Sequence, residues 1–239
     1  MKKTDAYRAK LKTLENWDTF LSQESGLPGP RGNLELAQAV ADEGTAELFE
    51  RYIKSPDEYL AVCGAIGLGR LVAEGQRKYL RPLRALASDS RWRVREGVAM
   101  ALQRVGDQDM DSLLREMKTW SQGNPLEQRA AAAALCEPRL LSEPQHVQRV
   151  VTILDDITAS IANVEDRKSP EFIALRKGLG YCWSVAVAAL PAEGKRRLEK
   201  WFSSRDADVL WIMRENLKED RLARMDAAWV ARWQKRLAR

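Results

Sequence analysis

The sequence has few of the residues that carry metal or thiol chemistry: one histidine and three cysteines among 239 residues. His146 is the only histidine, so no pair of histidines can bind a metal ion. Cys63, Cys136 and Cys182 are scattered, so neither a metal-ligand spacing nor a Cys–His pair is present. Each cysteine lies in an alanine-rich stretch of helical character, where a thiol acts as a small buried hydrophobic group. We therefore expect no metal, no cofactor and no thiol catalysis.

Long apolar runs are also missing. No stretch approaches the roughly 18 consecutive apolar residues of a membrane-spanning helix, and the richest one, YCWSVAVAALP, ends at Pro191. The N-terminal segment MKKTDAYRAKLKTLENW lacks the uninterrupted apolar block of a signal peptide. These absences predict a cytoplasmic protein with no membrane span.

No segment shows the alternation of apolar and polar residues that a half-buried β-strand requires. Apolar residues recur instead at helical spacing, as they do over residues 5–23, where we expect one continuous helix. The segment GLPGPRG at residues 26–32 predicts a break, because glycine and proline interrupt helices. The fold class predicted from these patterns is all-α.

The net charge of +5 is unevenly distributed. Residues 193–239 contain 13 Lys and Arg against 8 Asp and Glu, an excess of five, so the preceding 192 residues balance at 26 against 26. We therefore expect the C-terminal region to be positively charged and able to attract an anionic partner such as DNA.

The last stretch, ARMDAAWVARWQKRLAR, predicts an amphipathic helix over residues 225–238. Trp229, Trp233 and Leu237 share one stripe, and the remaining surface is basic through Arg232, Lys235 and Arg236. Three interpretations stay open for this helix. It is a cap that closes the end of a repeat array, a phosphate-binding edge, or a segment that contacts a membrane surface.

A segment repeats about every 34 residues, which indicates stacked helix pairs that share one core. The three copies are SPDEYLAVCGAIGL from Ser55, SRWRVREGVAMALQ from Ser90 and NPLEQRAAAAALCE from Asn124. We predict a single solenoid domain over residues 1–239, clearest at 55–141 and looser at 142–217. Ala65, Ala99 and Ala133 should then occupy equivalent buried positions.

Two copies share a helix start signal. Ser55 and Glu58 match a capping box with a proline at the first helical position, and Asn124 and Glu127 repeat that arrangement.

The stretch DSRWRVREGVAMALQRVGD at residues 89–107 resembles the HEAT-repeat signature, and NPLEQRAAAAAL is a second copy. The resemblance implies a right-handed superhelix of antiparallel helix pairs. In such repeats the arginine forms bonds along the stack, and small residues let neighbouring helices approach closely. It also implies a concave surface that binds a macromolecular partner, either nucleic acid or protein.

Parts of the chain are similar to the HEAT-like alkylpurine DNA glycosylases. SRWRVRE places Trp92 and Glu96 four residues apart on one helical face, which resembles the tryptophan–aspartate pair of that family. LEQRAAAAAL offers Arg129, and LWIMRENL offers Trp211 and Arg214. The resemblance implies that Glu96 stabilises a cationic transition state while tryptophans hold the alkylated base and arginines bind phosphate.

Our leading interpretation is nevertheless a binding protein without covalent chemistry, because Arg93 and Arg95 beside Glu96 oppose a cationic substrate. An alkylpurine DNA glycosylase is the alternative, with Glu96 as its catalytic residue. The candidate nucleic-acid-binding residues are Trp92, Arg95, Arg129, Trp211, Arg214, Arg232, Lys235 and Arg236.

Overall fold

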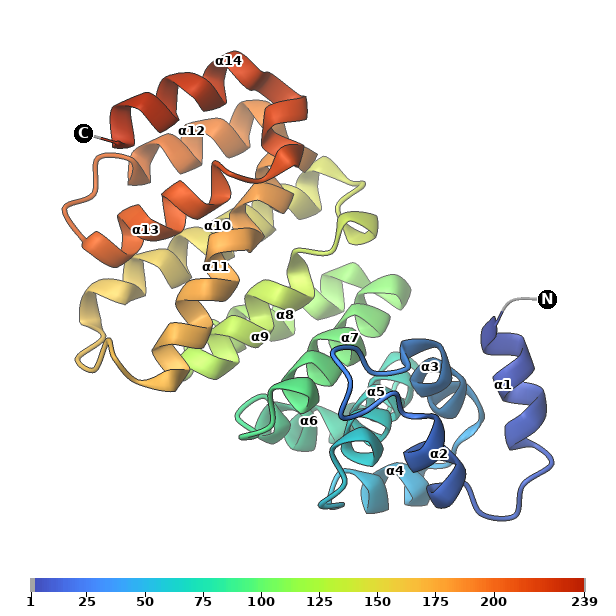
Figure 1. The fold of residues 1–239 in the computed structure, drawn as a ribbon. Helices are drawn as coiled ribbons and strands as arrows, with labels where there is room; N and C mark the ends of the chain where they lie inside the picture. Colours follow the sequence, from blue (N-terminus) through green and yellow to red (C-terminus); the bar gives the residue numbers. More distant parts are fainter. Residues whose placement is uncertain (1–2, 239) are drawn as a thin grey trace. The chain divides into compact units, whose positions relative to one another are not determined.

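The computed structural model describes residues 3–238, and within them every regular element is helical (Figure 1). The chain divides into two compact units, residues 1–109 and 110–239. Unit 1 contains α1 (Lys3–Leu11), α2 (Asp18–Glu24), α3 (Leu34–Glu43), α4 (Ala46–Tyr52), α5 (Glu58–Ala73), the 3-10 helix η1 (Arg77–Tyr79), α6 (Leu80–Leu86) and α7 (Trp92–Gln108). Unit 2 contains α8 (Met110–Trp120), α9 (Pro125–Leu135), η2 (Pro138–Leu140), α10 (Pro144–Ser160), η3 (Ile161–Asn163), α11 (Pro170–Ala189), α12 (Pro191–Trp201), α13 (Ala207–Asn216) and α14 (Asp220–Leu237). The predicted all-α fold is confirmed.

Helix α5 forms the centre of unit 1. Every residue of α5 other than Glu58, Arg70 and Ala73 is buried, because its sequence is apolar or small on all sides. It packs against α3 on one side and α7 on the other, and α4 and α6 cover it as the second helices of their pairs. The helices α1, α3, α5 and α7 therefore follow one another as neighbours, as expected for stacked pairs.

Glycines let the helices of unit 1 approach closely. A β-carbon at Gly69 of α5 would lie 2.4 Å from the Cα of Ala101 in α7, and one at Gly67 would lie 2.4 Å from the Phe49 ring of α4. A real β-carbon does not fit at either distance, so these contacts require glycine. The expectation that small residues permit close helix packing agrees with this arrangement.

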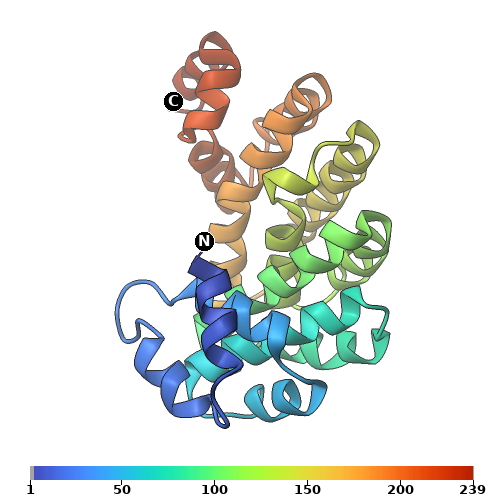
Figure 2. The same ribbon diagram turned by 90° about the vertical axis from the view of Figure 1, so that its right-hand side faces the viewer.

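Helix α11 has the corresponding central position in unit 2. It contacts α9 and α13 on its two sides, and α10, α12 and α14 pack on it as well (Figures 1 and 2). Buried polar groups connect these helices: the indole N–H of Trp183 donates to the Thr158 hydroxyl at 3.0 Å. Buried Asn216 of α13 accepts from the backbone N–H of Ser184 at 2.7 Å and donates to the carbonyl of Leu179 at 2.8 Å. Such satisfied buried groups specify the register between helices.

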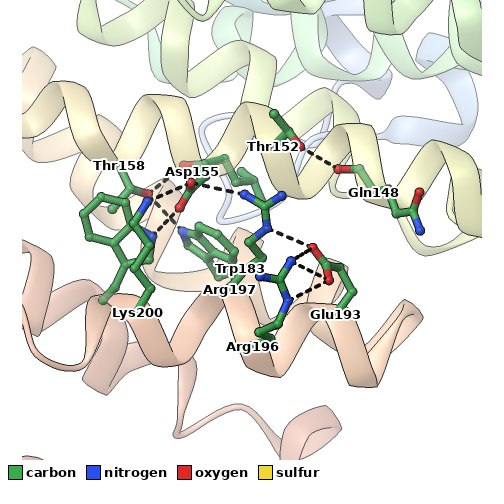
Figure 3. A network of polar contacts seen from close by, with 11 residues as sticks. Gln148, Thr152, Asp155, Thr158, Trp183, Glu193, Arg196, Arg197 and Lys200 are labelled. Carbon is green, nitrogen blue, oxygen red and sulfur yellow. Dashed lines mark hydrogen bonds and ion pairs between the residues drawn. The ribbon is translucent and has the colours of Figure 1, made fainter.

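A polar network beside the Trp183–Thr158 hydrogen bond joins α10 to α12 (Figure 3). Asp155, which is 9% exposed, accepts from the Trp201 indole at 2.8 Å and from Lys200 at 3.0 Å. Glu193 accepts from Arg196 and Arg197 on the same helix, which holds the pKa of this carboxyl below its usual value. Several C-terminal cations are therefore paired with carboxylates of the same unit.

The helix starts match the sequence signals in part. Asn124 caps α9 as predicted, with its side chain accepting from the N–H groups of Leu126 and Glu127. The predicted capping box at Ser55 is wrong. Asp57 caps α5 instead, because its carboxylate accepts from two backbone N–H groups while Ser55 accepts from Asp57 itself.

The helix expected over residues 5–23 is two helices, α1 and α2. The chain turns after Leu11, whose carbonyl accepts a hydrogen bond from the Trp17 indole at 3.0 Å. Of the three repeat alanines, Ala65 and Ala99 are buried and Ala133 is half-buried. The predicted burial therefore holds for the first two and is wrong for the third, and the equivalence of their positions stays a prediction. The handedness of the superhelix stays a prediction.

The C-terminal helix α14 begins at Asp220, five residues before its expected start at Met225. Its backbone is non-helical at Asp226, the residue that follows the expected start. The Asp226 carboxylate accepts from the N–H of Trp229 at 2.9 Å and so acts as an internal cap. Trp229 and Leu237 are buried, and the Trp233 ring lies 4.4 Å from the Phe202 ring. The apolar stripe thus packs on the end of α12.

Within residues 3–238, no helix combines the length and apolarity needed to cross a bilayer. The same residues contain no group of three or more metal-ligating side chains. All three cysteines are buried, and burial raises the pKa of the Cys63 and Cys136 thiols.

Candidate partner-binding site

A pocket of about 220 Å³ opens on unit 1 beside the first half of α7. We call it the Trp92 pocket. Its lining residues come from the loop at residues 26–32, the start of α3, the first half of α5 and α7. They are Pro30, Arg31, Gly32, Leu34, Tyr59, Val62, Trp92, Arg93, Glu96, Gly97 and Met100. Most of these side chains are apolar, so the pocket favours an apolar occupant.

The loop that forms one wall is tied to the helices. Arg93 of α7 donates to the carbonyl of Gly29 at 3.0 Å, and the Tyr59 hydroxyl of α5 donates to the carbonyl of Asn33 at 2.6 Å. Asn33 also caps α3, because its side chain accepts a hydrogen bond from the N–H of Leu36. Gly26 has a φ of 72°, a conformation that favours glycine, and it starts the turn. The glycine- and proline-rich segment is therefore a wall of the pocket as well as a helix break.

Trp92 is the most exposed large hydrophobic side chain of the pocket. It is 51% exposed, and Leu34 beside it is 37% exposed. Within residues 3–238 these two and Tyr181 are the exposed large hydrophobic residues, so two of the three line one pocket. The Arg93 guanidinium lies 4.7 Å from the Trp92 ring centroid while it pairs with Glu58 at 3.0 Å. A cation therefore already occupies one face of the indole.

Glu96 lies in the same pocket as Trp92, as their four-residue spacing predicts. Its side chain is half-buried and already takes part in polar or electrostatic interactions. Arg95, by contrast, donates to the carbonyls of Asp89 and Ser90 at 2.6 and 2.9 Å, in the loop before its own helix.

Bonds to the preceding repeat come from Arg91 and Arg93. Arg91 donates to the carbonyl of Ser55 at 2.9 Å, and its pairing with Asp89 lowers the pKa of that carboxyl. The arginine expected to bond along the stack is therefore found at two neighbouring positions.

Arg129 and Trp211 lie on different sides of α11. A β-carbon at Gly178 would lie 3.2 Å from Cγ of Arg129, and one at Gly180 would lie 3.3 Å from the Trp211 ring. Because two residues along an α-helix are about 200° apart, these contacts are on roughly opposite faces. Arg176 also lies 4.6 Å from the Trp211 ring centroid.

The other predicted basic residues lie on or against α14. Arg214 donates to the carbonyl of Leu237 at 3.0 Å, so it caps the end of that helix. Arg232 is exposed and lies 4.0 Å from Glu199, and Lys235 is exposed. Arg236 is exposed with its guanidinium 5.0 Å from the Trp233 ring centroid. These residues form a basic outer surface on the last helix.

Many cations of the C-terminal region are paired with carboxylates, although this pairing leaves the net excess of five charges unchanged. Lys195 pairs with Asp226 at 2.5 Å, which lowers the pKa of that carboxyl, and Lys218 pairs with Glu215 at 2.6 Å. Together with the pairs made by Asp155 and Glu193, these contacts neutralise many of the cations. The remaining exposed charges concentrate on α14.

Sequence reasoning identified only Trp92 and Glu96 among the residues that line the pocket, and those it missed include Arg31, Leu34 and Tyr59. Arg31 lies in the segment interpreted as a break. Leu34 directly follows Asn33, the capping residue of α3. An apolar residue at the first position of a helix is one signal that could have identified Leu34 as a site residue. Tyr59 is buried, so only the packing of the helices reveals that it lines the pocket. Burial also raises the pKa of its hydroxyl.

A family model of HEAT repeats matches residues 45–136, which run from α4 to α9. The predicted HEAT-like repeats are confirmed over that segment. Two crystal structures of engineered proteins from the Northeast Structural Genomics Consortium are similar to the chain at 17% identity. For the first, the alignment covers 91% of this chain and 96% of the engineered protein, with a TM-score of 0.35. For the second, it covers 89% of this chain and 57% of the engineered protein, with a TM-score of 0.38. Among curated proteins, none matches the sequence.

Proposed function

We propose that the chain is a HEAT-repeat scaffold that binds a protein partner through the Trp92 pocket and performs no covalent chemistry. The exposure of Trp92 and Leu34 at one pocket is the observation that carries this proposal. Tryptophan is enriched among the few residues that dominate binding energy at protein interfaces. Stacked repeats also present extended surfaces that suit macromolecular partners.

The pocket suits a protein better than a nucleic acid. A nucleobase carries hydrogen-bonding groups on its edges, and an apolar wall leaves such groups without partners. The exposed cations of α14 belong to unit 2, and many other C-terminal cations are paired. Contact with DNA would therefore be weak and of secondary importance.

We expect a photo-crosslinking residue at position 34 to trap one discrete partner in cells that contain the protein. Leu34→p-benzoylphenylalanine places the reactive group at the pocket mouth. The added substitution Trp92→Ala should lower the adduct yield by about tenfold or more, as for an interface hot spot. The adduct is measured by denaturing electrophoresis and mass spectrometry.

The matched control is the same residue at Arg81, an exposed position on α6 that does not line the pocket. Equal adducts from positions 34 and 81, or an adduct that survives Trp92→Ala, would contradict binding at the Trp92 pocket.

A DNA glycosylase remains the second candidate, because Trp92 and Glu96 do share one pocket. The electrostatics oppose it. Arg93 occupies one face of the Trp92 ring and Arg31 lies at the pocket wall, so these cations offset the attraction of Glu96 for a cationic alkylated base.

We expect purified protein to release no methylated purine from alkylated DNA above the spontaneous background. Glu96→Gln should leave that background unchanged and alter the free energy of unfolding by less than about 1 kcal/mol, as for a partly exposed ion pair. Released bases are quantified by chromatography and stability by denaturant titration. Excision by the wild type that Glu96→Gln abolishes without unfolding the protein would establish the enzyme instead.

A further inference from the structure

The charged residues of the Trp92 pocket differ in how they are engaged. Arg93 pairs with Glu58, bonds to Gly29 and stacks on Trp92, and Glu96 already takes part in interactions. Arg31 is exposed, and within residues 3–238 its guanidinium forms no ion pair. The pocket therefore combines an apolar space with one cation that is available to a partner.

Backbone contacts close the loop that carries Arg31. The N–H of Asn33 donates to the carbonyl of Ser25 at 2.8 Å, which closes the base of the loop. A β-carbon at Gly26 would lie 2.9 Å from the Arg31 carbonyl oxygen, so the two arms of the loop are in close contact. Because Arg93 also holds Gly29, the loop presents the Arg31 side chain from an anchored position.

We infer that the occupant of the Trp92 pocket is a short segment of the partner that places a phenylalanine or leucine next to a carboxylate. The inference rests on the proposed function and specifies the chemistry of the partner. The pocket volume of about 220 Å³ is sufficient for such a side chain, since an engineered cavity of about 150 Å³ holds benzene. The carboxylate pairs with Arg31.

Two other occupants fit less well. A lysine or arginine side chain would meet Arg31 at the wall and the Arg93 guanidinium behind the indole ring. An unpaired nucleobase could stack on Trp92 but would leave its polar edges against Val62, Leu34 and Met100. The apolar walls and the available cation together favour an apolar side chain beside an acid.

Fluorine NMR of the full chain labelled with 5-fluorotryptophan tests this inference, with the Trp92 signal assigned through Trp92→Phe. The probe is the blocked peptide acetyl-Gly-Asp-Phe-Gly-amide, for which we expect saturable displacement of the Trp92 signal with a roughly millimolar Kd. Two matched peptides replace Asp by Lys or Phe by Ala. Each should bind at least about fivefold more weakly, since one loses the ion pair and the other the buried ring.

Arg31→Gln should abolish the preference for Asp over Lys, and Arg81→Gln, which changes an exposed cation away from the pocket, should preserve it. The inference is overturned if the lysine peptide binds as well as the aspartate peptide. It is also overturned if an oligothymidine displaces the Trp92 signal and no peptide does so up to about 10 mM. A partner crosslinked at position 34 together with a lysine preference would reject this inference and leave the proposed function standing.

Discussion

Replacing Gly69 by alanine is expected to destabilise unit 1 by about 3 kcal/mol or more, although alanine is the better helix former. The new β-carbon would lie 2.4 Å from the Cα and 2.5 Å from the carbonyl oxygen of Ala101. Both are backbone atoms, so the clash is relieved only by separating α5 from α7. Because α5 is the centre of the unit, this loss is a large part of the roughly 5–15 kcal/mol that stabilises a domain.

Gly97→Ala is the matched control, since it makes the same substitution within α7. A β-carbon there would lie 3.4 Å from its nearest neighbours on Val62, which is ordinary contact. We expect this variant to be unchanged or up to about 1 kcal/mol more stable, because glycine is unfavourable within a helix. Denaturant titration measures both free energies, and hydrogen exchange in α5 and α7 locates the effect. Equal effects of the two substitutions would show that α5 and α7 tolerate separation.

The second large effect concerns DNA. Reversing the charges of Arg232, Lys235 and Arg236 to glutamate should lower the affinity for duplex DNA by more than about 100-fold at low salt. The three side chains are exposed on α14 and provide the basic outer surface of that helix. Wild-type binding should be weak, indifferent to sequence and strongly dependent on salt, because it consists of phosphate contacts alone.

Titration of a labelled duplex at two salt concentrations measures the affinity and the salt slope, which the triple variant should flatten. Reversing Arg77, Lys78 and Arg81 is the matched control, since these are exposed cations on η1 and α6 of unit 1. An equal loss in both triple variants would assign the binding to net charge and contradict a surface on α14. Absence of binding by the wild type at about 50 mM salt would leave the protein partner as the sole proposal.

Local sequence was sufficient where a feature depends on neighbours along the chain. The helical period, the cap at Asn124 and the interruption after α2 depend on residues that are close to one another along the chain. Repetition of the pattern then indicated stacking, because a single pair cannot bury its own apolar face. The adjacency of Trp92 and Glu96 was predictable for the same reason, as it is set by one turn of one helix.

Local sequence was insufficient where competing partners lie far along the chain. At the start of α5, Ser55 and Asp57 are both of residue types that can cap a helix, and Asp57 is the one that does so. Asp57 also accepts a hydrogen bond from Ser22 of α2. The early end of α1 depends on the turn after Leu11, where the Trp17 indole donates to the Leu11 carbonyl. Which cations of the C-terminal region are paired depends on ion pairs such as Asp155 with Lys200. Composition counts such charges, whereas only the fold decides which of them are paired.

By itself, the sequence determined an all-α chain with HEAT-like repeats over residues 45–136, the cap at Asn124 and the four-residue spacing that places Trp92 and Glu96 in one pocket. Tertiary structure alone decided that the loop at residues 26–32, α3, α5 and α7 enclose a pocket, that Arg93 covers one face of Trp92, and that Arg31 is left available. The reason is physical: helix periodicity and capping are short-range, whereas a pocket and its charge arise from side chains that only packing brings together.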